Sequence, residues 1–232
     1  MNVTPQQPPK PLVIGITGAA GAGKDTVAAI LKRHAAFRAL AFADALRTEV
    51  CAAYGIEPIY LTRRVFKDSP QAYLALGRCA DTGFVQTVLQ LHGVAKREAA
   101  DFLKQEQSPR QIMQWWGTEY RRNQAGPSYW LDQVRDTITV VNQVHEARNF
   151  VVTDVRFANE ANFIRGLGGG IWQVARPGAQ ATGQHASDVS GAEFAPDRVV
   201  DNSGTLDDLV ISTVEAYLAA ERLYLRGVLH AA

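Results

Sequence analysis

Short apolar runs alternate along this chain with segments of helical periodicity, and the alternation predicts the fold. Apolar runs that suit buried strands occupy residues 12–17, 38–43, 149–154, 171–175 and 198–201. Helical patterns fill most of the intervals between them. Strands that alternate with helices pair in parallel, and right-handed crossovers place the helices on both faces of the sheet. The pattern therefore predicts an α/β fold with a five-stranded, mostly parallel sheet.

The ends of several helices carry local signals. The first helix is expected from about Lys24 to His34, and the second opens at Asp44, a residue that suits the N-cap position. A further helix is expected over 128–145, and Thr205 opens the last one. The residues of helix 128–145 that recur at helical spacing, and should face the sheet, are Trp130, Val134, Ile138, Val141 and His145. The apolar stripe of the last helix is expected at Leu206, Val210, Val214 and Tyr217.

The chain is expected to form one domain over residues 12–232. Residues 1–11 are rich in Pro and Gln and are expected to be a disordered leader. The helix-rich stretch 56–125 follows the second strand and is expected to be an inserted subdomain. Its part 71–105 is helical in pattern, with Gly77, Gly83 and Gly93 as breaks.

One helix of the insertion has a clear start and a distinctive polar face. Ser108 suits an N-cap, and Pro109 suits the first helical position. Arg110, Gln114 and Thr118 recur every four residues and therefore share one face. That face carries a guanidinium able to grip phosphate and an amide able to contact a base.

A glycine loop joins the first strand to the first helix. Residues 18–26 are Gly-Ala-Ala-Gly-Ala-Gly-Lys-Asp-Thr, the context of a phosphate-binding P-loop. Its glycines let backbone N–H groups approach phosphate oxygens, and the helix N-terminus adds partial positive charge. Lys24 should reach the β- and γ-phosphates. Asp25 stands where Ser or Thr usually holds Mg²⁺, and a carboxylate there, with Thr26 beside it, can still ligate the ion or one of its waters.

Other candidate residues follow the later strands. The run 149–154 ends in Asp154, as a Walker B strand does, and Arg156 follows; the alternative is that Asp154 caps the next helix. Arg47 lies just past the second strand, and Arg63 belongs to a cluster of cations at 61–68; both could equally be solvated surface residues. The polar, glycine-containing loop 176–191 suits a mobile lid.

Composition narrows the function classes. The 232 residues are 47% hydrophobic and 20% charged, as in ordinary globular proteins. The net charge of +1 argues against binding to a nucleic acid polymer. Cys51 and Cys79, the only cysteines, favour reduced thiols in a cytoplasmic protein over a disulfide scaffold or zinc site. No apolar run is long enough for a membrane span.

Several motifs stand in an informative order. They are the loop from Gly18, Ser-Pro-Arg-x-x-Met-Gln-x-x-Gly-Thr-Glu from Ser108, Tyr129-Trp130, Asp-Val-Arg-Phe-x-Asn-Glu from Asp154, Arg-Pro-Gly from Arg176, His-x-Ser-Asp from His185, and Asp-Asn-x-Gly-Thr-Leu from Asp201. This set resembles the phage-type deoxynucleoside monophosphate kinases, which have the P-loop kinase fold. Asp188 stands where the family more often has Glu, and residues 70–105 do not align with it.

The resemblance implies transfer of the γ-phosphoryl group of ATP to a deoxynucleoside 5′-monophosphate (dNMP), with Mg²⁺ as cofactor. The implied catalytic residues are Lys24, Asp154, Arg156 and Arg176, and the implied metal contacts are Asp25, Thr26 and Asp154. The implied ATP contacts are Gly18, Gly21, Ala22, Gly23, Lys24, Asp25, Thr26, Arg176, His185, Asn202 and Gly204. The implied acceptor contacts are Asp44, Arg47, Arg63, Arg110, Gln114, Gly117, Thr118, Trp130, Asp154, Arg156 and Glu160.

Two alternative functions stay open. A dephospho-CoA kinase-like enzyme would share the sheet, loop and lid but phosphorylate a ribose hydroxyl. A non-catalytic nucleotide-binding switch would keep the loop, and Asp25 in place of Ser or Thr is compatible with it. The sequence also leaves open which bases are accepted, whether ribonucleotides are excluded, and whether a homodimer forms.

Overall fold

The computed structural model describes residues 10–63, 65–145, 149–179 and 194–230, which form two compact units. The first unit comprises Met1–Phe42 with Val134–Ala232, and the second comprises Ala43–Gln133. Residues 1–9 of the expected leader 1–11 and residues 180–191 of the expected lid loop 176–191 lie outside the described residues. The expected insertion 56–125 falls within the second unit, which begins earlier and ends later. Across the described ranges, no helix is both long and apolar enough to cross a membrane.

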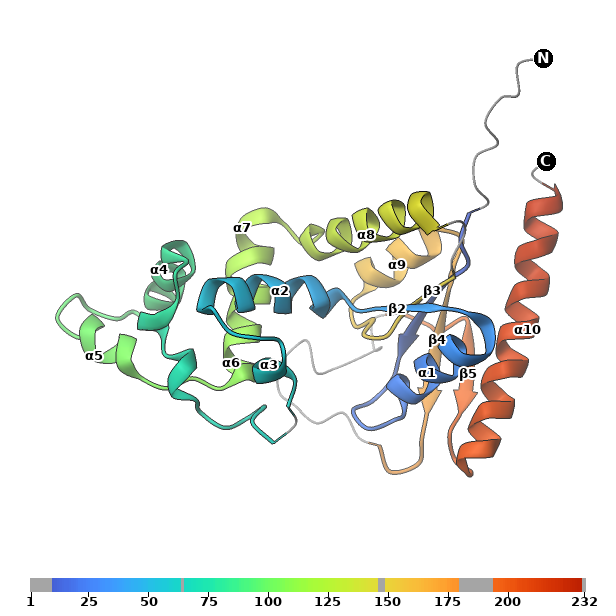
Figure 1. Ribbon diagram of the computed structural model, residues 1–232, viewed down its shortest axis with the longest axis horizontal. Coiled ribbons are helices and arrows are strands. Elements are labelled where there is room, and N and C mark those ends of the chain that lie inside the picture. The colour runs from blue at the N-terminus through green and yellow to red at the C-terminus, as the bar shows by residue number, and fades with distance from the viewer. Residues whose placement is uncertain (1–9, 64, 146–148, 180–193, 231–232) are drawn as a thin grey trace, which may run out of the picture. The chain divides into compact units, whose positions relative to one another are not determined.

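The first unit is built on a five-stranded sheet with the order β2-β3-β1-β4-β5 (Figure 1). Its strands are β1 (Val13–Thr17), β2 (Arg38–Leu40), β3 (Phe150–Val152), β4 (Gly170–Ala175) and β5 (Arg198–Asp201). All neighbouring pairs are parallel, and in the central strand Ile14 lies opposite Val151 of β3 and Gly170 of β4. The predicted α/β class is confirmed, and the sheet is parallel throughout.

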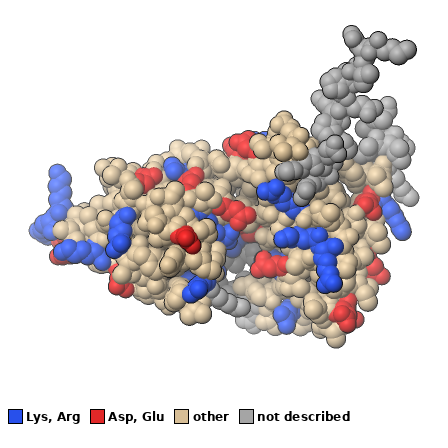
Figure 2. Space-filling view, in the orientation of Figure 1, with Lys and Arg blue, Asp and Glu red and all other residues tan. Residues whose placement is uncertain are grey.

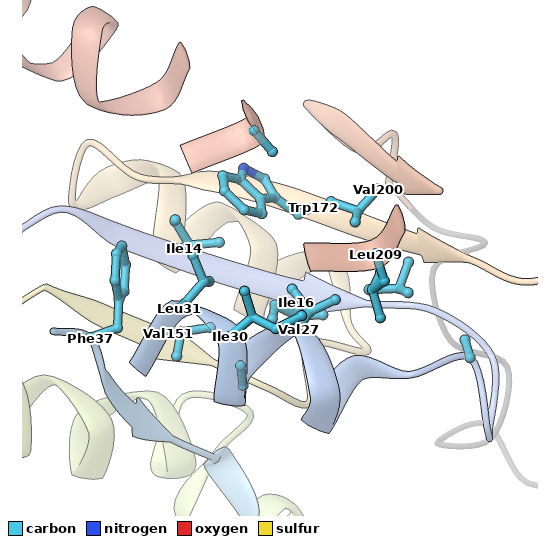
Figure 3. Close-up of a cluster of buried hydrophobic side chains, with 14 of the residues drawn as sticks. Ile14, Ile16, Val27, Ile30, Leu31, Phe37, Val151, Trp172, Val200 and Leu209 are labelled. Atoms are coloured by element: carbon cyan, nitrogen blue, oxygen red, sulfur yellow. The ribbon is translucent and has the colours of Figure 1, made fainter. Parts of the chain in front are cut away.

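Helices cover both faces of this sheet, as predicted. On one face, α1 (Lys24–Ala35) and α10 (Leu206–His230) close over the main hydrophobic core. Figure 3 shows this core, to which the sheet contributes Ile14, Ile16, Val151, Trp172 and Val200, and the two helices Val27, Ile30, Leu31 and Leu209. On the other face, α9 (Ala158–Gly166) packs against β1 and β4. This contact is close, because a Cβ on Gly15 of β1 would lie 3.3 Å from Ile164 Cγ1 of α9.

The second unit is helical. Its elements are α3 (Ile59–Thr62), η1 (Ala72–Leu74), η2 (Leu76–Arg78), α4 (Thr82–Leu91), α5 (Ala99–Lys104), α6 (Pro109–Gln114), the π-helical segment η3 (Trp115–Arg122) and α7 (Asn123–Ala125). Two helices run from one unit into the other: α2 (Phe42–Tyr54) and α8 (Tyr129–His145). The predicted helix start is confirmed, because the Ser108 hydroxyl accepts a first-turn amide and Pro109 is the first helical residue.

The second strand and the following helix differ from their prediction. The strand predicted over 38–43 ends at Leu40, and α2 begins at Phe42. The predicted N-cap role of Asp44 was therefore wrong. Asp154 supplies a carboxylate instead, because its Oδ1 accepts the backbone N–H of Phe42 at 2.8 Å. Asp44 lies in the first turn of α2 and pairs with Arg47 at 2.7 Å.

The stretch 71–105 is more broken than the pattern predicted. It consists of η1, η2, α4 and α5 with turns between them. The helix α4 begins after Asp81, whose carboxylate accepts a first-turn amide at 2.9 Å. It ends before Gly93, which has a φ of +59° and was correctly predicted as a break. Gly77 lies in η2, and Gly83 lies inside α4.

The two longest helices, α8 and α10, test the predicted apolar stripes. In α8, Trp130, Val134, Ile138 and Val141 are all buried, although Trp130 lies in the second unit and donates to Gly117 there, and the side chain of His145 lies outside the described residues. The start of α10 is also confirmed, because Thr205 and Asp208 exchange hydrogen bonds. Leu206 was wrongly assigned to its stripe, since the residue is 63% exposed. The buried positions are Leu209, Thr213 and Ala216, with Val210, Val214 and Tyr217 packed beside them.

Candidate nucleotide-binding site

The glycine loop between β1 and α1 has the geometry of an anion cradle. Gly18, Gly21 and Gly23 have φ values of +140°, +77° and +102°, which side-chain-bearing residues rarely adopt. Gly23 occupies the N-cap position of α1 and has no side chain that could accept the first-turn amides. No side chain caps the start of α1, so an anion can approach its amides there, and the helix dipole favours negative charge at this end.

The lysine of the motif is folded over this loop. Lys24 is the first residue of α1, and its Nζ donates to the carbonyl oxygens of Gly18 and Ala19 at 2.8 Å each. An ammonium group held by two carbonyls sits within the loop and can transfer its hydrogen bonds to phosphate oxygens.

Two residues predicted to contact ATP join the loop from later strands. Arg176 follows β4, and its Nη1 lies 3.4 Å from the carbonyl oxygen of Gly21. Asn202 follows β5, and its Nδ2 donates to the carbonyl of Ala22 at 2.7 Å. The Asn202 amide also lies where a Cβ on Gly23 would stand, at 2.5 Å. The carboxyl ends of β1, β4 and β5 therefore meet at the loop, as predicted for a parallel sheet.

A pocket of about 360 Å³ opens beside the loop. Its lining residues are Ala19, Ala22, Gln173, Val174, Ala175, Arg176, Pro177, Ala179 and Asp201. Most of these side chains are small or apolar, with one guanidinium and one carboxylate among them. Such a lining suits a flat nucleoside next to a phosphate cradle. Gly204, also predicted near the base, lies in the turn before α10, and the prediction for His185 falls outside the described residues.

The residues predicted to hold Mg²⁺ supply oxygen donors. Asp25 is exposed in the first turn of α1, and Thr26 follows it half-buried. In the part of the chain that the structure describes, no group of three or more His, Cys, Asp or Glu residues gathers as a metal cage. Because Mg²⁺ commonly takes one or two carboxylates and completes its shell with phosphates and water, this donor set fits an ion bound together with a nucleotide.

Asp154 lies at the same end of the sheet. Of its two neighbours, the amide of Thr153 donates to Leu40 of β2, and the amide of Val155 donates to Ile16 of β1. Asp154 thus stands between two strand ends and accepts the first amide of α2. Asp154 therefore binds the first amide of a helix, but that helix is α2, whereas the alternative interpretation had Asp154 cap the next helix in the chain.

The turn that carries Arg156 is held by a buried carboxylate. Glu160 is 2% exposed, and its carboxylate accepts the backbone amides of Arg156 at 2.8 Å and Phe157 at 3.2 Å. Predicted as an acceptor contact, Glu160 fixes the backbone of the turn that begins at Asp154.

The other predicted acceptor residues belong to the second unit. Arg47 pairs with Asp44, and Arg63 is exposed at the end of α3. The Nε of Arg110 donates to Asp68, and this hydrogen bond lowers the pKa of the Asp68 carboxyl. An acceptor phosphate at Arg110 would replace or join that carboxylate.

The predicted shared face of Arg110, Gln114 and Thr118 spans two kinds of helix. Arg110 and Gln114 lie in α6, and Thr118 lies in the π-helical segment η3. Backbone bonds run from i to i+5 in a π-helix, so Thr118 is rotated away from the position that an α-helix would give it. Trp130 is only 3% exposed, and its Nε1 donates to the carbonyl of Gly117 at 3.1 Å.

Comparison with known proteins identifies the family. The model of the deoxynucleotide monophosphate kinase family matches residues 79–212, more than half of the 232-residue chain. The chain belongs to this family. The match includes the motifs from Ser108 and Asp154, and it begins inside the stretch 70–105 that the sequence resemblance left unaligned. The glycine loop precedes the matched residues.

Individual relatives are more distant. A protein of Acanthamoeba polyphaga mimivirus, whose name assigns it provisionally to the deoxynucleotide monophosphate kinases, is 26% identical over 223 residues, which cover 88% of this chain and 96% of the relative. The crystal structure of TT1252 from Thermus thermophilus is 20% identical with a TM-score of 0.43, and the similarity covers 90% of this chain and 97% of that one. Dephospho-CoA kinase from Campylobacter jejuni is 11% identical with a TM-score of 0.40, with 90% and 96% covered.

The structure also shows a polar cluster that the sequence did not reveal. Glu49 of this kinase accepts hydrogen bonds from Trp116, Arg121 and Tyr129. These partners follow Glu49 by 67, 72 and 80 residues. No periodicity or motif links residues so far apart.

Proposed function

We propose that this protein transfers the γ-phosphoryl group of ATP to a dNMP, giving ADP and a deoxynucleoside diphosphate. The glycine loop carries the proposal: three positive-φ glycines and Lys24 meet the α1 N-terminus beside a pocket of about 360 Å³. Membership of the deoxynucleotide monophosphate kinase family supports the reaction class. ADP formation that depends on an added dNMP tests the proposal.

On the donor side, the chain positions phosphates and neutralises their charge. The amides at the start of α1 and the Nζ of Lys24 bind the β- and γ-phosphates, and Lys24 exchanges its two carbonyl partners for phosphate oxygens. Arg176, whose guanidinium lies at Gly21, adds positive charge where the γ-phosphoryl group is transferred. The nucleoside occupies the adjoining pocket.

On the acceptor side, the chain orients an anionic phosphate. An oxygen of the acceptor phosphate forms a bond to the γ-phosphorus as the bond to the β-phosphate oxygen breaks. This oxygen is already negatively charged, so the step needs no general base. Arg47, Arg63, Arg110 and Arg156 are proposed to hold the acceptor phosphate, and Gln114 and Thr118 to contact its sugar or base.

Mg²⁺, when bound with ATP, would screen the charge of the β- and γ-phosphates. Asp25 and Thr26 are proposed to hold the ion or its waters, together with Asp154, which follows β3 at the same end of the sheet. We expect Asp25→Asn to raise the Mg²⁺ concentration needed for half-maximal activity by about tenfold or more, because an amide is a weaker metal ligand than a carboxylate. A magnesium titration at fixed ATP measures this shift. Asp207→Asn, in the first turn of α10, is the matched control and should leave the titration unchanged.

We expect Arg110→Ala to raise the KM for the dNMP by one to two orders of magnitude, for a loss of about 1.5–3 kcal/mol from one charge-assisted contact. The KM for ATP should stay the same. Arg97→Ala removes an exposed, ion-paired arginine from the same unit and should change neither constant. A change confined to the KM for ATP would move Arg110 to the donor side.

Surface charge supports a small-molecule acceptor over a nucleic acid polymer. The net charge is +1. On the face seen in Figure 2, cationic and anionic side chains are interspersed. A polymer-binding surface would instead gather cations into a stripe.

A further inference from the structure

The carboxylate of Glu49 binds side chains from two other elements, and all of these residues lie in the second unit. Its Oε2 accepts the indole N–H of Trp116 at 2.8 Å and the Nε–H of Arg121 at 2.6 Å, and its Oε1 accepts the hydroxyl of Tyr129. Glu49 lies on α2, Trp116 and Arg121 lie on η3, and Tyr129 begins α8. One side chain therefore fixes α2 against η3.

Arg121 is held from several sides as well. Its guanidinium carbon lies 4.5 Å from the ring centre of Tyr120 and 5.5 Å from those of Trp116 and Tyr129. The side chains of Glu49 and Arg121 are only 22% and 27% exposed, so water screens their interaction little. Burial and the bond to Glu49 raise the pKa of the Tyr129 hydroxyl, which therefore remains a donor.

The contact with Glu49 depends on the π-helical backbone. Trp116 and Arg121 are five residues apart, and in an α-helix of about 3.6 residues per turn they would point about 140° apart. A π-helix bonds i to i+5, so residues at this spacing lie on nearly the same face. Both side chains can reach one carboxylate because η3 is π-helical, and the carboxylate in turn stabilises that conformation.

A second contact joins α2 to the same segment. A Cβ on Gly117 would lie 3.2 Å from Leu46 Cδ2, so α2 approaches the η3 backbone closely at this point. Trp130 holds the carbonyl of Gly117 from α8. Arg47, proposed to grip the acceptor phosphate, lies on α2 between Leu46 and Glu49.

We infer that Glu49 is a positioning residue for acceptor recognition: it holds η3 in its π-helical form and thereby sets where Thr118 faces relative to Gln114 and to α2. The inference rests on the proposed function for the identity of the acceptor. Its claim about the backbone can be measured without turnover.

The test combines kinetics with hydrogen exchange. We expect Glu49→Ala to raise the KM for the dNMP about tenfold while the KM for ATP changes less than about twofold. Amides of residues 114–122 should exchange faster in the free protein, and those of the first unit should not. Glu49→Gln, which keeps one carbonyl acceptor, should recover part of both effects.

Asp197→Ala is the matched control. Its carboxylate also has three donors, the amide of Ile171 and two nitrogens of Arg165, but it lies in the first unit. This variant should lose thermal stability without changing the KM for the dNMP or the exchange at 114–122. If Glu49→Ala does not fold, Glu49→Gln and Tyr129→Phe carry the same comparison.

Each outcome is decisive. Unchanged exchange at 114–122 would overturn the inference whatever the kinetics show. Faster exchange with both KM values unchanged, or both raised equally, would reduce Glu49 to a structural anchor and overturn it too. If the wild type phosphorylates no dNMP, the proposed function fails, and exchange alone then decides whether Glu49 holds the π-helix.

Discussion

Replacing Lys24 with alanine is expected to lower phosphoryl transfer by about 10²- to 10³-fold or more, the scale seen when a preorganised charge-stabilising donor is removed. The Nζ of Lys24 lies on the loop carbonyls of Gly18 and Ala19, where it can pass to the phosphates. The residue is outside the hydrophobic core, so the variant should fold normally. Steady-state turnover and a thermal melt measure the two halves of this expectation.

The matched control for this variant is Lys32→Ala. Lys32 carries the same charge in the last turn of α1 and is exposed, away from the loop. It should keep full turnover. Wild-type turnover by Lys24→Ala would refute the assignment of the glycine loop to ATP, and equal losses in both variants would point to the charge of α1 rather than to contact with phosphate.

The second large effect is expected from Gly18→Ala. The φ of Gly18 is +140°, and an added Cβ would lie 2.6 Å from the backbone carbonyl oxygen of Val174. That oxygen belongs to β4 and cannot move aside as a flexible side chain could. The loop must therefore shift, and we expect the free energy of unfolding to fall by about 3–4 kcal/mol, with ATP binding weakened as the amides leave their places. Chemical denaturation and calorimetric titration with ATP measure these changes.

Gly21→Ala separates the cost of backbone strain from the cost of a steric clash. Gly21 has a φ of +77°, and nothing lies within 4 Å of the Cβ position. Only the backbone penalty applies, and the loss of stability should be about 1–2 kcal/mol. If Gly18→Ala were no more destabilising than Gly21→Ala, that result would contradict the close contact between the loop and β4.

The sheet and its loop were predictable because their signals are local. A run such as 12–17 predicts a buried strand, and the glycines and Lys24 that follow constrain the turn within a few residues. Strands joined by helices then bring the carboxyl ends together. The contacts of Arg176 and Asn202 with the loop follow from that topology.

The errors arose where distant residues decide the local structure. Asp44 has the right chemistry for an N-cap, but Asp154 takes the role from the end of β3, and α2 starts two residues earlier. Leu206 begins an apolar pattern, but it is exposed. The side of α10 that is buried instead includes Leu209. Neither tertiary contact leaves a trace in the nearby sequence.

The π-helical segment illustrates the same limit inside the second unit. Spacing by four places Arg110, Gln114 and Thr118 on one α-helical face, and this expectation fails at η3. The wider turn is stabilised by Glu49, far earlier in the chain. Local propensity does not favour a π-helix, so only the folded environment explains it.

The central claim is tested most directly by ADP formation from ATP and Mg²⁺ with a panel of acceptors. The panel holds the four dNMPs, the four ribonucleoside monophosphates, dephospho-CoA and a blank without acceptor. We expect turnover with at least one dNMP and loss of that turnover in Lys24→Ala. Turnover with dephospho-CoA alone would contradict the proposed acceptor, and tight ATP binding with no acceptor-dependent turnover would contradict the kinase reaction and favour a nucleotide switch.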